Sequence, residues 1–144
     1  IAMLIVGLFL LYYSIIPNMN ILFLPILLII MMITASGFGM WLSALAVQYR
    51  DIRHAMQFLT QLLMYSAPVV WPASLLQSKF GEEFLYWYAL YPMVGVIEGF
   101  RSCLIGNTPM PWVLIIIGLV SACFLFFTGA LYFKNKENIF ADVV

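Results

Sequence analysis

The chain has 144 residues, of which 65% are hydrophobic and 8% charged, and its six basic residues balance its six acidic residues. Soluble domains contain roughly 45–50% apolar and about 25% charged residues, so this composition excludes an ordinary water-soluble enzyme and a disordered chain. It also excludes a nucleic-acid-binding protein, which needs a basic surface. The mean hydropathy of +1.07 indicates a membrane protein.

Long uncharged stretches predict an all-α membrane protein, because about 20 apolar residues in a helix cross a bilayer. The first 49 residues carry no charge and are long enough for two such helices. The chain begins within an apolar run and without an initiator Met, so we expect a fragment of a longer protein. We predict a turn at residues 17–20 and four spans, over residues 1–16, 21–47, 55–71 and 112–133.

The positions of Lys and Arg predict the orientation. Arg50 and Arg53 lie between the second and third spans, and Lys134 and Lys136 follow the last one. With four spans these two regions face the same side, and together they hold four of the six basic residues. Because basic residues favour the cytoplasmic side, we expect the Arg50 loop and the C-terminus in the cytoplasm. Lys79 then lies outside.

The segment 72–111 is too apolar for a plain loop between spans. It contains two short apolar runs, residues 84–90 and 93–105. Runs of about a dozen residues or fewer are too short to span a bilayer and favour re-entrant or interfacial helices. We therefore predict a re-entrant pair of short helices before the last span.

Glu98 and Arg101 are spaced i, i+3 on the second of these short helices, so their side chains can touch. They form either a buried pair that faces a cavity or an anchor near the lipid headgroups. If they form a buried pair, a charge swap should do less harm than removal of one charge. Small residues recur every fourth position and predict close packing, within the chain or between subunits. They are Gly95, Gly99 and Cys103 on this helix, and Ala35, Gly39 and Ser43 on the second span.

Aromatic residues make up 17% of the chain, and many fall on the expected outer side. An aromatic belt at headgroup depth explains most of them. A platform on which sugar rings stack is the alternative, with Trp71, Trp87 and Tyr88 as its candidates.

The sequence has no phosphate-binding loop, and its only histidine, His54, has no second ligand nearby, which argues against a nucleotide site or a metal site. The main spans hold no ionisable residue, which argues against an ion-coupled carrier. No helix shows a repeating polar stripe, so nothing indicates a simple channel.

The loop between the second and third spans is the most specific segment. Asp51 precedes the third span and is a candidate cap for its first amides. Residues 42–53, which end in Tyr49-Arg50-Asp51-Ile52-Arg53, resemble the permease subunits of ABC-2-type exporters, in particular exporters of O-antigen, capsule or teichoic acid. Residues 67–72, 91–101 and 140–144 resemble further segments of that family in the right order, with Tyr91 where the family has Asn.

The resemblance implies six spans with both termini cytoplasmic, of which this chain would contain the last four. It implies two paired permeases and two separate ATP-binding cassette subunits, which hold the ATP and Mg and carry out the hydrolysis. This chain would then be a transport subunit with no catalytic residue and no cofactor of its own. In that family, aromatic side chains guide the sugar chain, so the resemblance favours the platform interpretation of Trp71, Trp87 and Tyr88 without selecting among them.

We therefore expect a multi-pass permease of the bacterial plasma membrane that exports a lipid-linked polysaccharide and contacts a second copy of itself, the ATP-binding subunits and membrane lipids. An exporter of a drug or a lipid, or a membrane enzyme or scaffold of envelope assembly, are the alternatives. Tyr49, Arg50, Asp51 and Arg53 are candidates for the contact with the ATP-binding subunits or for the base of a gate. The two arginines alternatively set only the topology and meet lipid phosphates.

Overall fold

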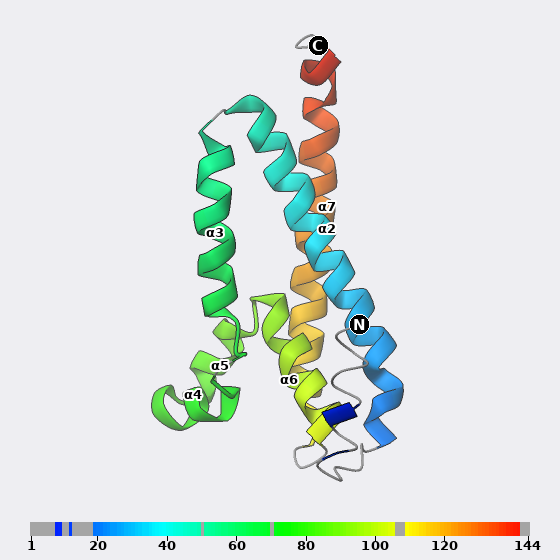
Figure 1. Ribbon diagram of the computed structural model, residues 1–144, viewed down its shortest axis with the longest axis vertical. Coiled ribbons are helices and arrows are strands. Elements are labelled where there is room, and N and C mark those ends of the chain that lie inside the picture. The colour runs from blue at the N-terminus through cyan, green and yellow to red at the C-terminus, as the bar shows by residue number, and fades with distance from the viewer. Residues whose placement is uncertain are drawn as a thin grey trace.

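The computed structural model describes residues 8, 9, 12, 19–49, 51–69, 71–105 and 109–141 (Figure 1). Every regular element in these ranges is a helix, which confirms the predicted all-α fold. The predicted span over residues 1–16 lies outside the description apart from residues 8, 9 and 12. In order, the elements are the 3-10 helix η1 (Met19–Phe23) and the helices α2 (Leu24–Gln48), α3 (Ile52–Ser66), α4 (Ala73–Phe80), α5 (Glu82–Tyr88), α6 (Pro92–Ile105) and α7 (Trp112–Ala141).

The predicted turn at residues 17–20 is only partly described. Pro17 and Asn18 lie outside the description, whereas Met19 and Asn20 begin η1 rather than close a turn. The 3-10 helix leads directly into α2, so the chain enters this long helix through a tighter helical turn.

Helices α2 and α7 lie side by side and run in the same direction (Figure 1). Glycines allow the close approach. A Cβ atom added to Gly37 would lie 2.8 Å from the backbone nitrogen of Phe126, and one added to Gly129 would lie 2.7 Å from the carbonyl oxygen of Gly37. Next to this contact, Trp41 Nε1 donates to Thr128 Oγ1 at 3.2 Å. The two backbones are therefore in direct contact, as small residues permit in membrane proteins.

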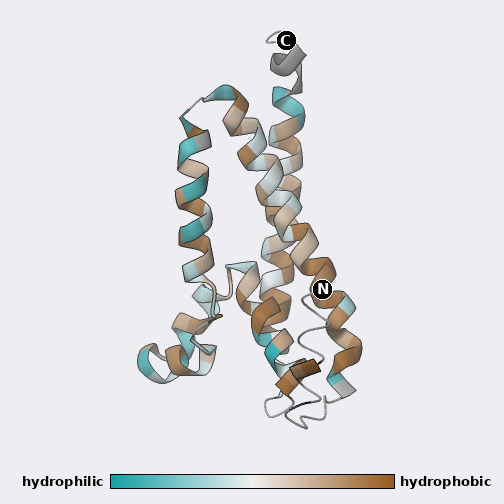
Figure 2. Ribbon diagram, viewed as in Figure 1, coloured by the Kyte–Doolittle hydropathy of each residue, from teal (hydrophilic) through white to brown (hydrophobic). Residues whose placement is uncertain are grey.

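The outward faces of α2 and α7 are apolar, as expected of helices surrounded by lipid (Figure 2). Within the described residues, Asn20–Gln48 and Trp112–Lys136 are the two helical segments long and apolar enough to cross a membrane. On α7 a stripe of apolar side chains is 54–68% exposed, and it consists of Val113, Ile116, Val120, Phe124, Phe127 and Leu131.

Helix α3 differs from the predicted span over residues 55–71. It has 15 residues and ends at Ser66, because Ala67 is extended and Pro68 follows. Its length of about 22 Å is less than the hydrocarbon core of about 30 Å, so a third crossing stays a prediction. The predicted cap is wrong: Asp51 occupies the N-cap position, but its side chain makes no capping hydrogen bond.

Three short helices, rather than the predicted two, connect α3 with α7. Helix α4 was missed because its sequence is mixed polar and apolar, and Gly81, with a φ of 87°, turns the chain from α4 into α5. Helix α6 packs along α7, and a Cβ added to Gly118 would lie 3.1 Å from the carbonyl oxygen of Pro92. The first residue of α6 is thus level with a point about 9 Å along α7 from Trp112. This is the geometry of a segment that doubles back beside a span.

The small residues divide into two groups. Those of α6 pack within the chain: a Cβ added to Gly95 would lie 2.5 Å from the Leu114 carbonyl oxygen, and Cys103 is fully buried. The small residues predicted for α2 do not pack within the chain, and a contact between subunits through them stays a prediction. Nothing lies within 4 Å of a Cβ added to Gly39, and Ala35 and Ser43 are exposed. Position 37, two residues before Gly39, makes the contact with α7 instead.

The core lies where α2, α6 and α7 meet. Its buried side chains form one cluster that draws on all three helices, and each of them is at most 6% exposed. They are Leu27, Ile30, Val96, Cys103, Ile115 and Ala122. These three helices therefore form a single packed body.

The two glycines of α2 provide a matched test of the contact with α7. Gly37→Ala should lower the free energy of unfolding by about 1–3 kcal/mol, because the new methyl group meets backbone that must move. Gly39→Ala should raise it by about 0.5–1 kcal/mol, because the site is open and alanine is the better helix former. Thermal unfolding in detergent, followed by circular dichroism, measures both. Equal shifts of the same sign would contradict this packing.

Candidate functional site

Helix α3 carries a polar face that points away from the core. Its partly buried residues, Ile52, Met56, Leu59 and Leu63, follow one another at helical spacing and mark the inner face. The polar residues lie on the opposite side at spacings of three and four, and all are exposed: they are His54, Gln57, Thr60 and Gln61. Figure 2 shows polar residues along α3, whereas α2 and α7 are mainly apolar.

Helix α3 therefore has polar residues at a repeating spacing that the sequence analysis did not single out, and exposed apolar residues such as Phe58 and Tyr65 lie among them. The i, i+4 spacing of Gln57 and Gln61 indicates this face in the sequence. The span predicted over residues 55–71 rested on the absence of charged residues, and glutamine is uncharged. Within the described residues, no hydrogen bond involves the side-chain amide of either glutamine. An amide that faces lipid is costly, so this face requires water or another polar surface.

The predicted cytoplasmic site lies at one end of the α2–α7 pair. Tyr49 is 53% exposed, and Gln48 Nε2 donates to its hydroxyl oxygen at 3.4 Å. Asp51 is also exposed. Arg50 and the side chain of Arg53 lie outside the described part of the chain, so their part in this site stays a prediction.

The same end includes the polar part of α7. Tyr132 donates its hydroxyl hydrogen to Gln48 Oε1 at 3.2 Å, and Lys136 Nζ lies 6.0 Å from the centre of the Tyr132 ring. Tyr132 also stacks on Trp41 at 4.6 Å between ring centres. The α2–α3 loop and the basic part of α7 are therefore at the same end of the molecule, and Lys79 in α4 is at the opposite end (Figure 1).

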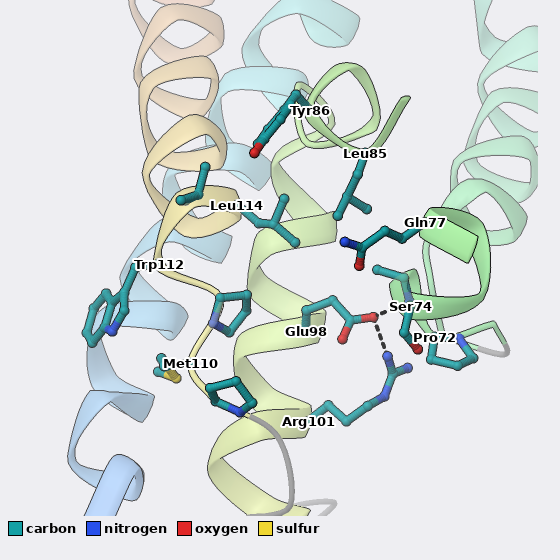
Figure 3. A pocket seen from close by; sticks show the side chains of 14 residues that line it. Pro72, Ser74, Gln77, Leu85, Tyr86, Glu98, Arg101, Met110, Trp112 and Leu114 are labelled. Carbon is teal, nitrogen blue, oxygen red and sulfur yellow. Dashed lines mark hydrogen bonds and ion pairs between the residues drawn. The ribbon is translucent and has the colours of Figure 1, made fainter. Parts of the chain in front are cut away.

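The structure brings Glu98 and Arg101 together as an ion pair on α6. Each also binds the backbone of the turn between α3 and α4. Figure 3 shows the pair and the contact of Glu98. The amide of Ala73 donates to Glu98 Oε1 at 2.7 Å, and Arg101 Nη2 donates to the carbonyl oxygen of Pro68 at 2.8 Å. The side chains are 15% and 22% exposed, respectively. Neither earlier interpretation described these backbone partners, which lie 25 and 33 residues away in the sequence.

A pocket of about 480 Å³ lies beside this pair, between α4 and α5 on one side and α6 and the start of α7 on the other. In Figure 3, Ser74 and Gln77 lie on the wall next to the pair, and Trp112 lies on the far side. Much of its polar lining already has protein partners: besides the pair, Gln77 Nε2 donates to Glu82 Oε1 at 3.2 Å. These side chains therefore hold the segment together. Within the described ranges, no three His, Cys, Asp or Glu side chains are placed to share a metal ion.

The three aromatic candidates have different surroundings. Trp71 and Trp87 are 63% and 75% exposed. The hydroxyl of Tyr88 donates to the carbonyl oxygen of Ser66, at the end of α3. Burial raises the pKa of Tyr88, and Tyr91 and Glu98 raise it further, so the hydroxyl stays protonated at any physiological pH. Tyr88 thus has a role in the fold, whereas the two tryptophans are free to meet a ligand.

Comparison with known proteins gives one curated relative and one family. The chain is 23% identical over 129 residues to the O-antigen export system permease protein RfbA of Myxococcus xanthus, a match that covers 89% of this chain and 48% of that protein. The chain therefore spans about half the length of this relative. No solved structure matches it with significance. The sequence profile of the ABC-2 type transporter family matches residues 1–105. Because this match covers more than half of the chain, the protein belongs to the ABC-2 type transporter family.

Proposed function

We propose that the protein is the membrane subunit of an ATP-driven exporter that moves a lipid-linked polysaccharide across the bacterial plasma membrane, with its C-terminus in the cytoplasm. It acts with a second copy of itself and with separate ATP-binding subunits, which hold the ATP and Mg and perform the hydrolysis. Family membership supports the transport role. The cargo is supported by the relative, whose name describes an O-antigen export permease.

The polar face of α3 is the observation that carries this proposal. Helices α2 and α7 present apolar side chains outward and suit lipid, whereas α3 presents the amides of Gln57 and Gln61 away from the core. A polar polymer needs hydrogen-bonding groups along its path, because the bilayer supplies none. Two copies that face one another across their α3 helices would surround such a path and shield both polar faces from lipid.

The loop at Tyr49 and Asp51 is the proposed entry point for mechanical work. It joins α2, which belongs to the packed core, to α3, which carries the polar face. Closure of the ATP-binding subunits against this loop would displace α3 relative to α2, a rigid-element movement of the kind that gates many transporters. Arg50 and Arg53 belong to the same segment and supply its positive charge.

Trp71 and Trp87 are the proposed contacts of the glycan. Both belong to the segment between α3 and α6, at the end of the molecule opposite the α2–α3 loop (Figure 1). Their exposed rings suit stacking against the apolar faces of sugar rings, an arrangement that tolerates many sugars because it reads shape and not individual hydroxyl groups.

Replacing the amides of α3 tests the path. Gln57→Leu combined with Gln61→Leu should lower export of surface polysaccharide at least tenfold, because the lining loses its hydrogen-bonding groups. Gln57→Asn with Gln61→Asn should retain most of it. Surface glycan, measured by gel electrophoresis of extracts, gives the result, and the amount of protein in the membrane fraction is the control. Normal export by the leucine variant would refute the path. Normal surface glycan in cells that lack the gene would refute the polysaccharide cargo and favour another one.

The loop has its own test. Arg50→Ala combined with Asp51→Ala should reduce export severalfold at unchanged membrane insertion, because the force would no longer reach α3. Lys136→Ala is the matched control, since it removes a basic charge at the same end of the molecule without changing the loop. Co-purification of an ATP-binding subunit with the unmodified protein tests the partner. If only insertion or orientation changes in the loop variant, the arginines serve topology and not coupling.

A further inference from the structure

Helix α3 is held to the rest of the molecule mainly at one end. Among its described side chains none is buried, in contrast to the many buried residues of α2 and α6. The residue after it, Ala67, is extended, with φ and ψ of −73° and 141°, and on the other side the chain is extended at Tyr49, before the helical residue Asp51. A helix with few packed side chains can change its angle without disturbing a core.

The end of α3 next to α4 is the attached one. The turn that follows it is packed, since Ala67 is 9% exposed, Pro68 is less than 2% exposed and Ala73 is 4% exposed. Glu98 binds the amide at the end of this turn, and Arg101 binds the carbonyl group at its beginning. The ion pair thus holds both sides of the turn from a single helix.

Two tyrosines add to this attachment. Tyr91 donates its hydroxyl hydrogen to the carbonyl oxygen of Leu63 at 3.3 Å, and Tyr88 donates to that of Ser66. Both acceptors are near the end of α3, where the carbonyl oxygen of Leu63 also accepts the amide of Ala67 at 3.1 Å. Together with the pair, these contacts connect the end of α3 to the segment that leads into α6.

Helix α6 provides a firm base for the pair. On either side of it, Val96 is 2% and Cys103 0% exposed, and both belong to the core shared with α2 and α7. The backbone of Gly95 is in contact with that of Leu114 on α7. Glu98 and Arg101 therefore project from the packed core towards the end of a helix that has no buried side chain among its described residues.

We propose that Glu98 and Arg101 are positioning residues that hold the α4-side end of α3 in place, so that α3 swings about this end when its other end is displaced. Only the cause of the displacement, the ATP-binding subunits, rests on the proposed function. A rotation of about 10° about one end of a helix about 22 Å long moves the other end by about 4 Å. The polar face would shift most near the α2–α3 loop and least near α4.

The two residues have fixed places, because one backbone partner is a donor and the other an acceptor. A carboxylate accepts hydrogen bonds and a guanidinium only donates them. Exchanging the two would bring a carboxylate to the carbonyl oxygen of Pro68 and a guanidinium to the amide of Ala73, and both backbone bonds would be lost. A charge swap should therefore fail to restore the position of the α3 end. A buried pair whose only partners are one another would instead tolerate the swap better than the loss of one charge.

Spin-label distances in the complete exporter, reconstituted in lipid nanodiscs, test the swing. With Cys103 and Cys123 replaced by Ala, labels at positions 55 and 131 report the loop end of α3 against α7. Labels at positions 65 and 113 report the attached end. Addition of a non-hydrolysable ATP analogue should change the first distance by several ångströms and leave the second within about 1 Å. Equal movement at both ends, or movement elsewhere in the complex with α3 at rest, would overturn the swing.

Variants without nucleotide test the positioning separately. Glu98→Gln and Arg101→Met should broaden the distance distribution between positions 65 and 113, and the swap Glu98→Arg with Arg101→Glu should broaden it equally. Glu82→Gln is the matched control, since Glu82 is exposed in the same segment and binds only Gln77. Unchanged distributions in the single variants, or a swap that restores the narrow distribution and export, would overturn the positioning role. Because these measurements need no ATP, they test the positioning role of Glu98 and Arg101 independently of the proposed function.

Discussion

A polar group in hydrocarbon needs a partner or water, and this constraint organises the whole molecule. The outward stripe of α7, such as Val120 and Phe124, is apolar and needs neither. The amides of Gln57 and Gln61 face away from the core, where water or another polar surface can satisfy them. The backbone of the turn after α3 instead finds its partners within the chain, in Glu98 and Arg101.

Close backbone contact holds three helices together. Gly37, Gly129 and Gly95 bring α2, α7 and α6 together so closely that backbone touches backbone. Such a body needs little help from polar side chains, which leaves the charged pair of α6 available to hold a neighbouring segment. The result is a packed three-helix unit beside a loosely attached amphipathic helix, a division that suits a protein in which one part moves against another.

Several features followed from composition and periodicity alone. Long uncharged runs predicted the helices that became α2 and α7, and the i, i+3 spacing of Glu98 and Arg101 was enough to predict that they touch. The register of small residues was different. Gly39 belongs to a series of small residues at every fourth position, yet Gly37 makes the contact with α7, because the facing helix decides which side of α2 is covered. A pattern within one helix does not contain that information.

Properties that depend on neighbours in the chain were therefore accessible from the residues themselves: the all-α class, the apolar spans, the basic end and the family resemblance, which the profile match confirms. Contacts across 25 or 33 residues were not. No periodicity relates Glu98 to the amide of Ala73, and none shows that the polar side of α3 points outward. Those relations arise only when α6 packs into the core and brings its pair against the turn after α3, because packing between distant segments is set by the shapes of all the helices together.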